Sequence, residues 1–182
     1  MKELSLNILD IAENSVKAGA SLIEIDLSET DEKLIISIKD NGCGMSEETL
    51  KSVTDPFYTT RTTRKVGLGI PFFKMEAEQT GGKFEIISKQ SVNSDDLHGT
   101  CVTAEFIKES IDFIPLGNIS ETVVTLIQGH PDRDFLLRHK KADKTVLLDT
   151  REMRNILENI PLDSYEVIKF IKDYLLEQYS EF

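Results

Sequence analysis

The sequence of 182 residues has only two cysteines, Cys43 and Cys101, and they do not form a CxxC pair. Two isolated thiols exclude a disulfide framework, and their spacing excludes a zinc finger. A chain of this length needs neither, because it can bury roughly 70% of its unfolded surface in an ordinary core. The expected class is a globular protein with one domain of ordinary size and an appendage.

Long apolar runs are also missing, since no stretch approaches the roughly 18 residues that a membrane span requires. Residues 1–5 do not begin an apolar signal core. We therefore expect a cytoplasmic protein that neither crosses nor binds a membrane.

Basic residues are in the minority, with 21 lysines and arginines against 32 acids and a net charge of −11. Nonspecific binding of nucleic acid requires a basic face, so a nucleic-acid partner is not expected. One stretch departs from this balance, because residues 56–75 contain Arg61, Arg64, Lys65 and Lys74 and no acid. The absence of acids from this stretch favours a local anion site, although a basic loop without a ligand would explain it equally well.

Several enzyme motifs are absent. The sequence has no GxxxxGK[ST] run, no HExxH and no GxSxG, which argues against a P-loop protein, a zinc protease of that type and an α/β-hydrolase. The run Gly67-Leu68-Gly69 lacks the third glycine of a dinucleotide fingerprint and does not lie in a βαβ unit.

Apolar periodicity predicts the elements of the first hundred residues. The expected elements are a helix over 4–17, adjacent strands over 23–27 and 34–38, a short helix starting at Ser46, a helix from Gly67–Gly69 to 80, and strands over 84–88 and 100–106.

The pattern changes near residue 110, where we place a domain boundary. The first domain would span 1–110, and a small α+β region would span 111–182. The second region is expected to contain a helix over 118–129, a hairpin of strands 134–139 and 145–149, and helices over 150–159 and 164–178. It contains no motif and would supply a partner or dimerisation surface, or simply cap the first domain.

The first helix carries a polar stripe of Asn7, Asp10, Asn14 and Lys17. Such a stripe is usually a solvated face. Asparagine is nevertheless a poor helix former. Its amide oxygen could complete a Mg²⁺ shell, since magnesium takes hard oxygen ligands and shares them with substrate phosphates.

Asp40 ends a predicted strand and is followed by Gly42 and Gly44. The run is compatible with a simple turn, but it also suits base recognition. An ionised carboxylate only accepts hydrogen bonds, so it matches an amino donor such as adenine N6. Glycines would let a flat base approach the backbone. Farther along, Gly67 and Gly69 precede a helix start, where free N–H groups and the helix dipole favour phosphate.

Taken in order, these segments resemble the GHKL superfamily of gyrase-type topoisomerases, 90-kilodalton heat-shock chaperones, histidine kinases and mismatch-repair ATPases. The resemblance covers residues 1 to 107 and is strongest to the histidine kinase-like ATP-binding domain. The matching segments are 10–20 for the N box, 40–45 for the first glycine box, 55–61 for the F box, 67–70 with 81–82 for the second glycine box, and 99–100 for the late Gly-Thr.

The resemblance implies an α+β protein with a two-layer α/β sandwich of the Bergerat type, in which helices cover one face of a mixed sheet. It implies ATP and Mg²⁺ as cofactors. Asn14 would ligate Mg²⁺, and Asp40 would take the adenine amino group with support from Thr100. The remaining nucleotide-binding residues would be Lys17, Gly42, Gly44, Arg61, Gly67, Leu68 and Gly69.

Hydrolases of this superfamily carry a glutamate four residues before the N-box asparagine, where this chain has Asp10. Asp10 would be the catalytic base, with a reach shorter by about 1.5 Å. The resemblance thus implies an ATPase, or a kinase of a separate protein. The alternative is a non-hydrolysing switch, like anti-sigma regulators, in which ATP orders the lid and changes partner affinity. The kinase and the switch each need a protein substrate or partner, which we expect for this chain, and a homodimer is left open.

Overall fold

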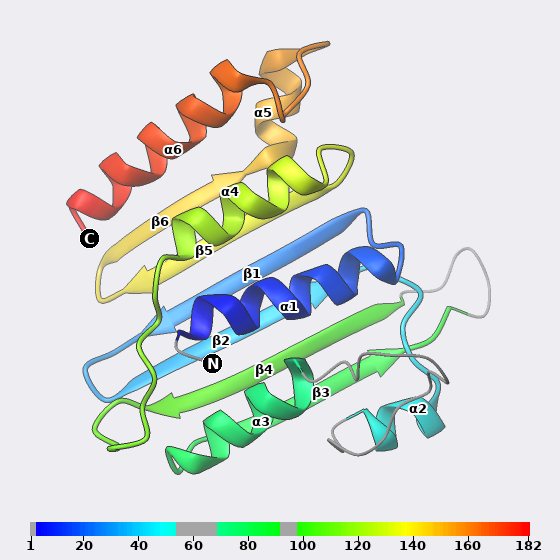
Figure 1. Cartoon of the computed structure of the whole chain (residues 1–182), viewed down its shortest axis with the longest axis vertical. Coiled ribbons are helices and arrows are strands. Elements are labelled where there is room, and N and C mark those ends of the chain that lie inside the picture. The colour runs from blue at the N-terminus through cyan, green and yellow to red at the C-terminus, as the bar shows by residue number, and fades with distance from the viewer. Residues whose placement is uncertain (1–2, 54–68, 92–97) are drawn as a thin grey trace.

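A six-stranded mixed sheet with the order β3-β4-β2-β1-β5-β6 runs the length of the molecule (Figure 1). The structure is a computed structural model that describes residues 3–53, 69–91 and 98–182. Strand β1 pairs with β5 in parallel, and every other neighbouring pair is antiparallel. The strands are β1 (Leu22–Glu29), β2 (Lys33–Asp40), β3 (Lys83–Lys89), β4 (Gly99–Ile107), β5 (Asp134–Lys141) and β6 (Lys144–Asp149).

Helices cover one face of this sheet, with α1 in contact with α3 on one side and α4 on the other, and α6 next to α4 (Figure 1). The predicted α+β class and the two-layer arrangement are confirmed. Within the described residues, no helix is long and apolar enough to cross a bilayer. The helices are α1 (Leu4–Lys17), α2 (Glu47–Ser52), α3 (Gly69–Gln79), α4 (Ile119–Gly129), α5 (Thr150–Leu157) and α6 (Tyr165–Ser180).

The core lies between the helices and the sheet, because alternate residues of the central strands point to the helices and are buried. Phe73 of α3 packs on Phe106 of β4 with ring centroids 5.4 Å apart. The same core continues into the C-terminal region. Phe135 and Leu137 of β5 are fully buried, and they pair with Ile23 and Ile25 of β1.

The predicted division near residue 110 stays a prediction about where the ATP-binding unit ends. Backbone pairing passes across it, since β1 and β5 are in register from Leu22↔Asp134 to Glu29↔Lys141. The predicted hairpin is confirmed as β5 and β6. The predicted helices over 118–129, 150–159 and 164–178 are α4, α5 and α6, with ends displaced by two residues at most.

One part of the predicted polar stripe is not solvated. Asn7 is fully buried, and its amide nitrogen donates to the carboxylate of Glu76, which is also buried. Helix α3 packs against α1 at this position, so a side chain that the helical wheel assigns to solvent lies between two helices instead. Leu6, an apolar residue of the same helix, is 43% exposed.

A second buried polar group, His139 of β5, lies under the C-terminus. It is 2% exposed, its Nδ1 is 3.0 Å from the hydroxyl of Tyr179, and its ring is 4.5 Å from that of Phe182. Its Nε2 is 3.4 Å from Oε2 of Glu29, whose other carboxylate oxygen faces Lys141 at 3.6 Å. Burial lowers the pKa of His139 below its ordinary value of 6.5, although the Glu29 carboxylate opposes that change.

We expect this histidine to make the fold less stable in mild acid. Because the unfolded chain binds the His139 proton more readily than the folded one, the free energy of unfolding should fall as pH drops below 6.5, by up to about 1.4 kcal/mol per pH unit. A His139→Leu variant should lose less stability than the parent between pH 7 and pH 5 in thermal melts. Equal losses would contradict this assignment. Glu29 does not affect this comparison between pH 7 and pH 5. Its pKa is lowered from 4.5, so its contribution to the free energy of unfolding is lost only in stronger acid.

Candidate functional site

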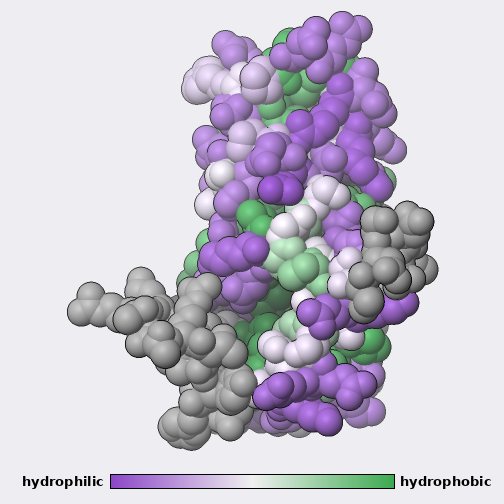
Figure 2. Space-filling view, turned by 90° about the vertical axis from the view of Figure 1, so that its right-hand side faces the viewer, coloured by the Kyte–Doolittle hydropathy of each residue, from purple (hydrophilic) through white to green (hydrophobic). Residues whose placement is uncertain are grey.

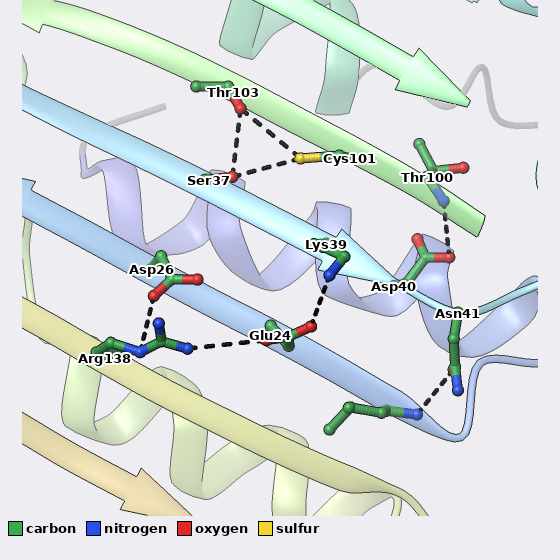
Figure 3. Close-up of polar contacts among 11 residues, drawn as sticks. Glu24, Asp26, Ser37, Lys39, Asp40, Asn41, Thr100, Cys101, Thr103 and Arg138 are labelled. Carbon is green, nitrogen blue, oxygen red and sulfur yellow. Dashed lines mark hydrogen bonds and ion pairs between the residues drawn. The ribbon is translucent and has the colours of Figure 1, made fainter. Parts of the chain in front are cut away.

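Asp40 lies at the C-terminal end of β2, on the side of the sheet that faces α1. Its Oδ1 accepts a hydrogen bond from the backbone N–H of Thr100 at 3.2 Å (Figure 3). Oδ1 also accepts from the backbone N–H of Gly42 at 2.8 Å, and Oδ2 accepts from the hydroxyl of Ser15 at 2.8 Å. A carboxylate offers about four acceptor positions. Described residues occupy three of these positions, which fixes the orientation of the Asp40 carboxylate. One acceptor position on Oδ2 is left for a ligand.

Helix α1 supplies the next polar groups. Asp10 and Asn14 are four residues apart and therefore lie on the same face of the helix, one turn from each other. Asp10 is exposed and Asn14 is half-buried, and neither side chain has a hydrogen bond or ion pair to another described residue. Ser15, which follows Asn14, joins this helix to Asp40. Lys17 lies exposed in the last turn.

The loop after β2 is shaped by Gly44, whose φ of +67° is a backbone conformation that L side chains rarely adopt. A Cβ here would lie 2.0 Å from the carbonyl oxygen of Lys89 at the end of β3. Gly99 is under the same constraint, with φ of +126° and a would-be Cβ 2.0 Å from the carbonyl oxygen of Asp40. Both glycines are thus required for the loop, β3 and β4 to meet beside Asp40.

Thr100 contributes to this junction in two ways. Its backbone N–H donates to Asp40, while its hydroxyl is 2.8 Å from the hydroxyl of Ser88 in β3. Ser88 in turn accepts from the N–H of Met45 at 2.8 Å. The main chain of Thr100 therefore contacts Asp40, and its side chain bonds to Ser88, whose hydroxyl joins the loop to the sheet.

The N-terminus of α3 lies against α1. At Gly69 a Cβ would be 3.1 Å from the Cβ of Asp10, so the helix begins directly beside that carboxylate. Three further predicted nucleotide-binding residues, Arg61, Gly67 and Leu68, lie outside the described residues.

Three residues of the site were not predicted: Ser15, Ser88 and His98. The Nδ1 of His98 is 2.5 Å from the carbonyl oxygen of Gly42. Its position directly before Gly99 was the only signal in the sequence. Ser15 and Ser88 had none, because a serine in a helix or strand has no pattern that sets it apart.

The opposite face of the sheet carries a separate polar network. Cys101 lies 3.5 Å from the hydroxyl of Ser37 and 3.8 Å from that of Thr103, and it points away from α1 (Figure 3). Beside it, ion pairs connect Lys39 to Glu24 and on through Arg138 to Asp26. Cys101 therefore does not face Asp40.

The groups around Asp40 gather on one side of the molecule, where β2 ends and β4 begins. Figure 2 looks onto that side and shows a hollow at mid-height whose walls are apolar or weakly polar, within a strongly polar surface. Within the described part of the chain, no group of three or more His, Cys, Asp and Glu side chains converges to hold a metal ion. The amide oxygen of Asn14 and the carboxylate of Asp10 are hard oxygen donors that bond to no other described residue, the chemistry by which a cation is shared with a ligand's own oxygens.

A comparison with protein families finds one match over most of the chain. Residues 2–110 match the model of the histidine kinase-, DNA gyrase B- and HSP90-like ATPases. Among curated proteins, the chain is similar to the sensor protein KdpD of Clostridium acetobutylicum, at 34% identity over 96 residues, or 50% of this chain and 11% of that protein. It is also similar to sporulation kinase C of Bacillus subtilis, at 30% identity over 94 residues, or 52% of this chain and 22% of the kinase. The matched part is thus under a quarter of these relatives.

Among solved structures, the chain resembles the Aquifex aeolicus MutL ATPase domain complexed with ADP. The TM-score is 0.54 at 14% identity, over 87% of this chain and 70% of that one. The N-terminal domain of a DNA repair protein gives a TM-score of 0.57 at 17% identity, over 82% of this chain and 53% of that one. These TM-scores, at such low identities, establish a shared fold alone. Both likenesses extend past residue 110, where the family match ends.

Proposed function

Because the chain belongs to the histidine kinase-, DNA gyrase B- and HSP90-like ATPase family, we propose that it binds Mg-ATP beside Asp40 and transfers the terminal phosphoryl group to water or to a separate protein. The observation that carries the proposal is the state of Asp40. Three donors orient its carboxylate, and one acceptor position stays open. Such a fixed, acceptor-only group selects an amino donor over a carbonyl, which distinguishes adenine from guanine.

The remaining groups fit a bound nucleotide. Gly42 and Gly44 leave no side chain at the loop where the base would lie, and Asn14 has an amide oxygen available for Mg²⁺. The magnesium would neutralise charge on the phosphates. Asp10, one turn away, would accept a proton from the attacking hydroxyl group. The roles proposed for Lys17, Arg61, Gly67, Leu68 and Gly69 are contacts with the phosphates.

The direct test is to incubate the purified chain with ATP labelled on its terminal phosphate and to separate the products. Free phosphate would identify an ATPase, and a labelled protein would identify a kinase. A thermal shift with Mg-ATP, measured in parallel, tests binding alone. No shift with Mg-ATP would overturn the whole proposal.

Asp40→Asn should weaken nucleotide binding and remove its base selectivity. The amide presents a donor where an acceptor is needed, and a lost hydrogen bond to a charged group costs about 1.5–3 kcal/mol, or roughly a factor of 10 to 100 in Kd. The preference for ATP over GTP, measured by competition, should shrink by a similar factor. Asp112→Asn, in an exposed loop, is the matched control and should leave both constants unchanged. Equal affinity of the parent for ATP and GTP would contradict the role of Asp40.

The second candidate is a non-hydrolysing switch, in which Mg-ATP binding changes affinity for a protein partner. It is favoured by the start of α3, which lies directly against Asp10. A carboxylate one methylene shorter than glutamate, packed beside the N-terminus of α3, would respond to the position of that helix rather than activate water. ATP that is bound but returned unchanged would identify this second function.

Under both candidates the partner is a protein and the compartment is the cytoplasm. Nucleic acid is not expected as a partner, because the chain carries a net charge of −11.

A further inference from the structure

The C-terminal end of the molecule carries an apolar groove between α5 and α6, far along the sheet from Asp40 (Figure 1). Its volume is about 500 Å³. Apolar surface is visible near the top of Figure 2, within polar surroundings. The groove is lined by Met153, Ile156, Leu157, Ile160, Val167 and Phe170, with Glu166 as the one charged residue.

The side chains at the rim of this groove point outward. Ile156 is 82% exposed, Phe170 58% and Ile160 55%. An occupant that only filled the hollow would leave these three side chains in water. Covering them requires a body larger than a small molecule, with an apolar face of its own. An amphipathic helix meets this requirement, because it lays one apolar stripe into a groove between two helices.

The unpaired charges around the groove are mainly negative, and the exception is Lys169 of α6, next to Phe170, which has no ion pair with another described residue. Glu166 lines it, and Glu152, Glu158 and Asp163 are close in sequence to its lining residues. None of these four carboxylates has an ion pair with another described residue. The two arginines of α5 are already neutralised.

Those two arginines are Arg151, which pairs with Asp149 at 2.6 Å, and Arg154, which pairs with Asp134 at 2.7 Å. A second copy of this acidic chain would bring the same carboxylates to the rim, where like charges repel. A basic partner would supply the missing counter-charges. Charge complementarity therefore selects the partner.

We propose that the α5–α6 groove binds an amphipathic helix of another protein, with an apolar stripe flanked by lysine or arginine. The inference does not depend on the proposed nucleotide function, since the groove is remote from Asp40 and is complete without ATP. The partner's helix would place two or three apolar side chains between Ile156 and Phe170. Its basic residues would then lie over Glu166 and the neighbouring acids.

The test uses the full chain without nucleotide and a synthetic helix of about 18 residues, roughly five turns. The probe has leucine at positions i, i+3, i+4 and i+7 and lysine elsewhere. Two further peptides serve as comparisons, one with glutamate in place of lysine and one with the lysine peptide's composition in scrambled order. In a fluorescence titration the lysine peptide should bind at least about tenfold more tightly than either of them.

Variants of the chain place the binding in the groove. Ile156→Asp and Phe170→Asp should each weaken the lysine peptide by about tenfold or more, and both side chains are exposed enough for the fold to tolerate the change. Leu176→Asp is the matched control, since this leucine is 71% exposed on α6 but does not line the groove. It should leave binding unchanged.

Three results would overturn the inference. The scrambled peptide could bind as tightly as the amphipathic one, which would show that net charge alone causes the binding. Leu176→Asp could weaken binding as much as Ile156→Asp. Sedimentation could show a dimer of the chain that Ile156→Asp dissociates, which would make a second copy the occupant.

Discussion

Replacing Asn14 by alanine is expected to abolish the stabilisation that Mg-ATP gives to the chain. Bound at a hundred times its Kd, a ligand stabilises the folded state by about 2.7 kcal/mol. For a protein of this size, that corresponds to a rise in Tm of roughly 5–10 °C. If the Asn14 amide completes the Mg²⁺ shell, the variant should show little of this rise. It should melt like the parent without ligand, because its side chain bonds to no other described residue.

The control for this variant is Asn155→Ala, the same chemical change at an exposed position of α5. It should keep the full shift. A second comparison omits the metal, since the parent with ATP and a chelator should resemble Asn14→Ala with Mg-ATP. A full shift in Asn14→Ala would remove Asn14 from the metal site and leave the assignment of Asp40 standing.

The order of strands along the sheet could not be predicted from the sequence, although the strands themselves could. Alternation of apolar and polar residues identifies β1 and β2, because every second residue of a half-buried strand faces the core. The parallel pairing of β1 with β5 joins residues more than a hundred positions apart, and no local pattern encodes it. One hint was present, since Phe135, Leu136 and Leu137 are consecutive and all three are buried. A strand that is covered on both faces shows this pattern.

Residues around Asp40 could be singled out in the sequence only where a pattern marks them. Gly44 and Gly99 occupy conformations and close approaches that only glycine tolerates, but Gly44 belongs to a glycine-rich run, whereas Gly99 was singled out only by the family resemblance. Ser15, by contrast, orients Asp40 through one hydroxyl, and a helical serine has no distinguishing pattern. Asn7 was misplaced for a related reason. A helical wheel sorts residues by polarity, whereas the neighbouring helix α3 buries Asn7 with Glu76.

Asp10→Asn is expected to lower ATP turnover by a factor of about 10² to 10⁴, the usual contribution of a general base. An amide has no free carboxylate to accept the proton of the attacking water, so the bond from water to the terminal phosphorus forms more slowly. Binding should persist, because Asp40 and Asn14 are unchanged. The measurement is phosphate release under saturating Mg-ATP, with the thermal shift recorded on the same sample.

Two companion variants make this result specific. Asp173→Asn removes an exposed carboxylate from α6 and should leave turnover unchanged. Asp10→Glu lengthens the base by about 1.5 Å and restores the residue that hydrolases of the superfamily carry at this position. Turnover at or above the parental level in Asp10→Glu, together with its loss in Asp10→Asn, would establish a base whose reach limits the rate. If Asp10→Asn hydrolyses ATP as fast as the parent, Asp10 is not the base. If the parent has no turnover and Asp10→Glu gains it, the shorter side chain at this position is what turns an ATPase site into a switch.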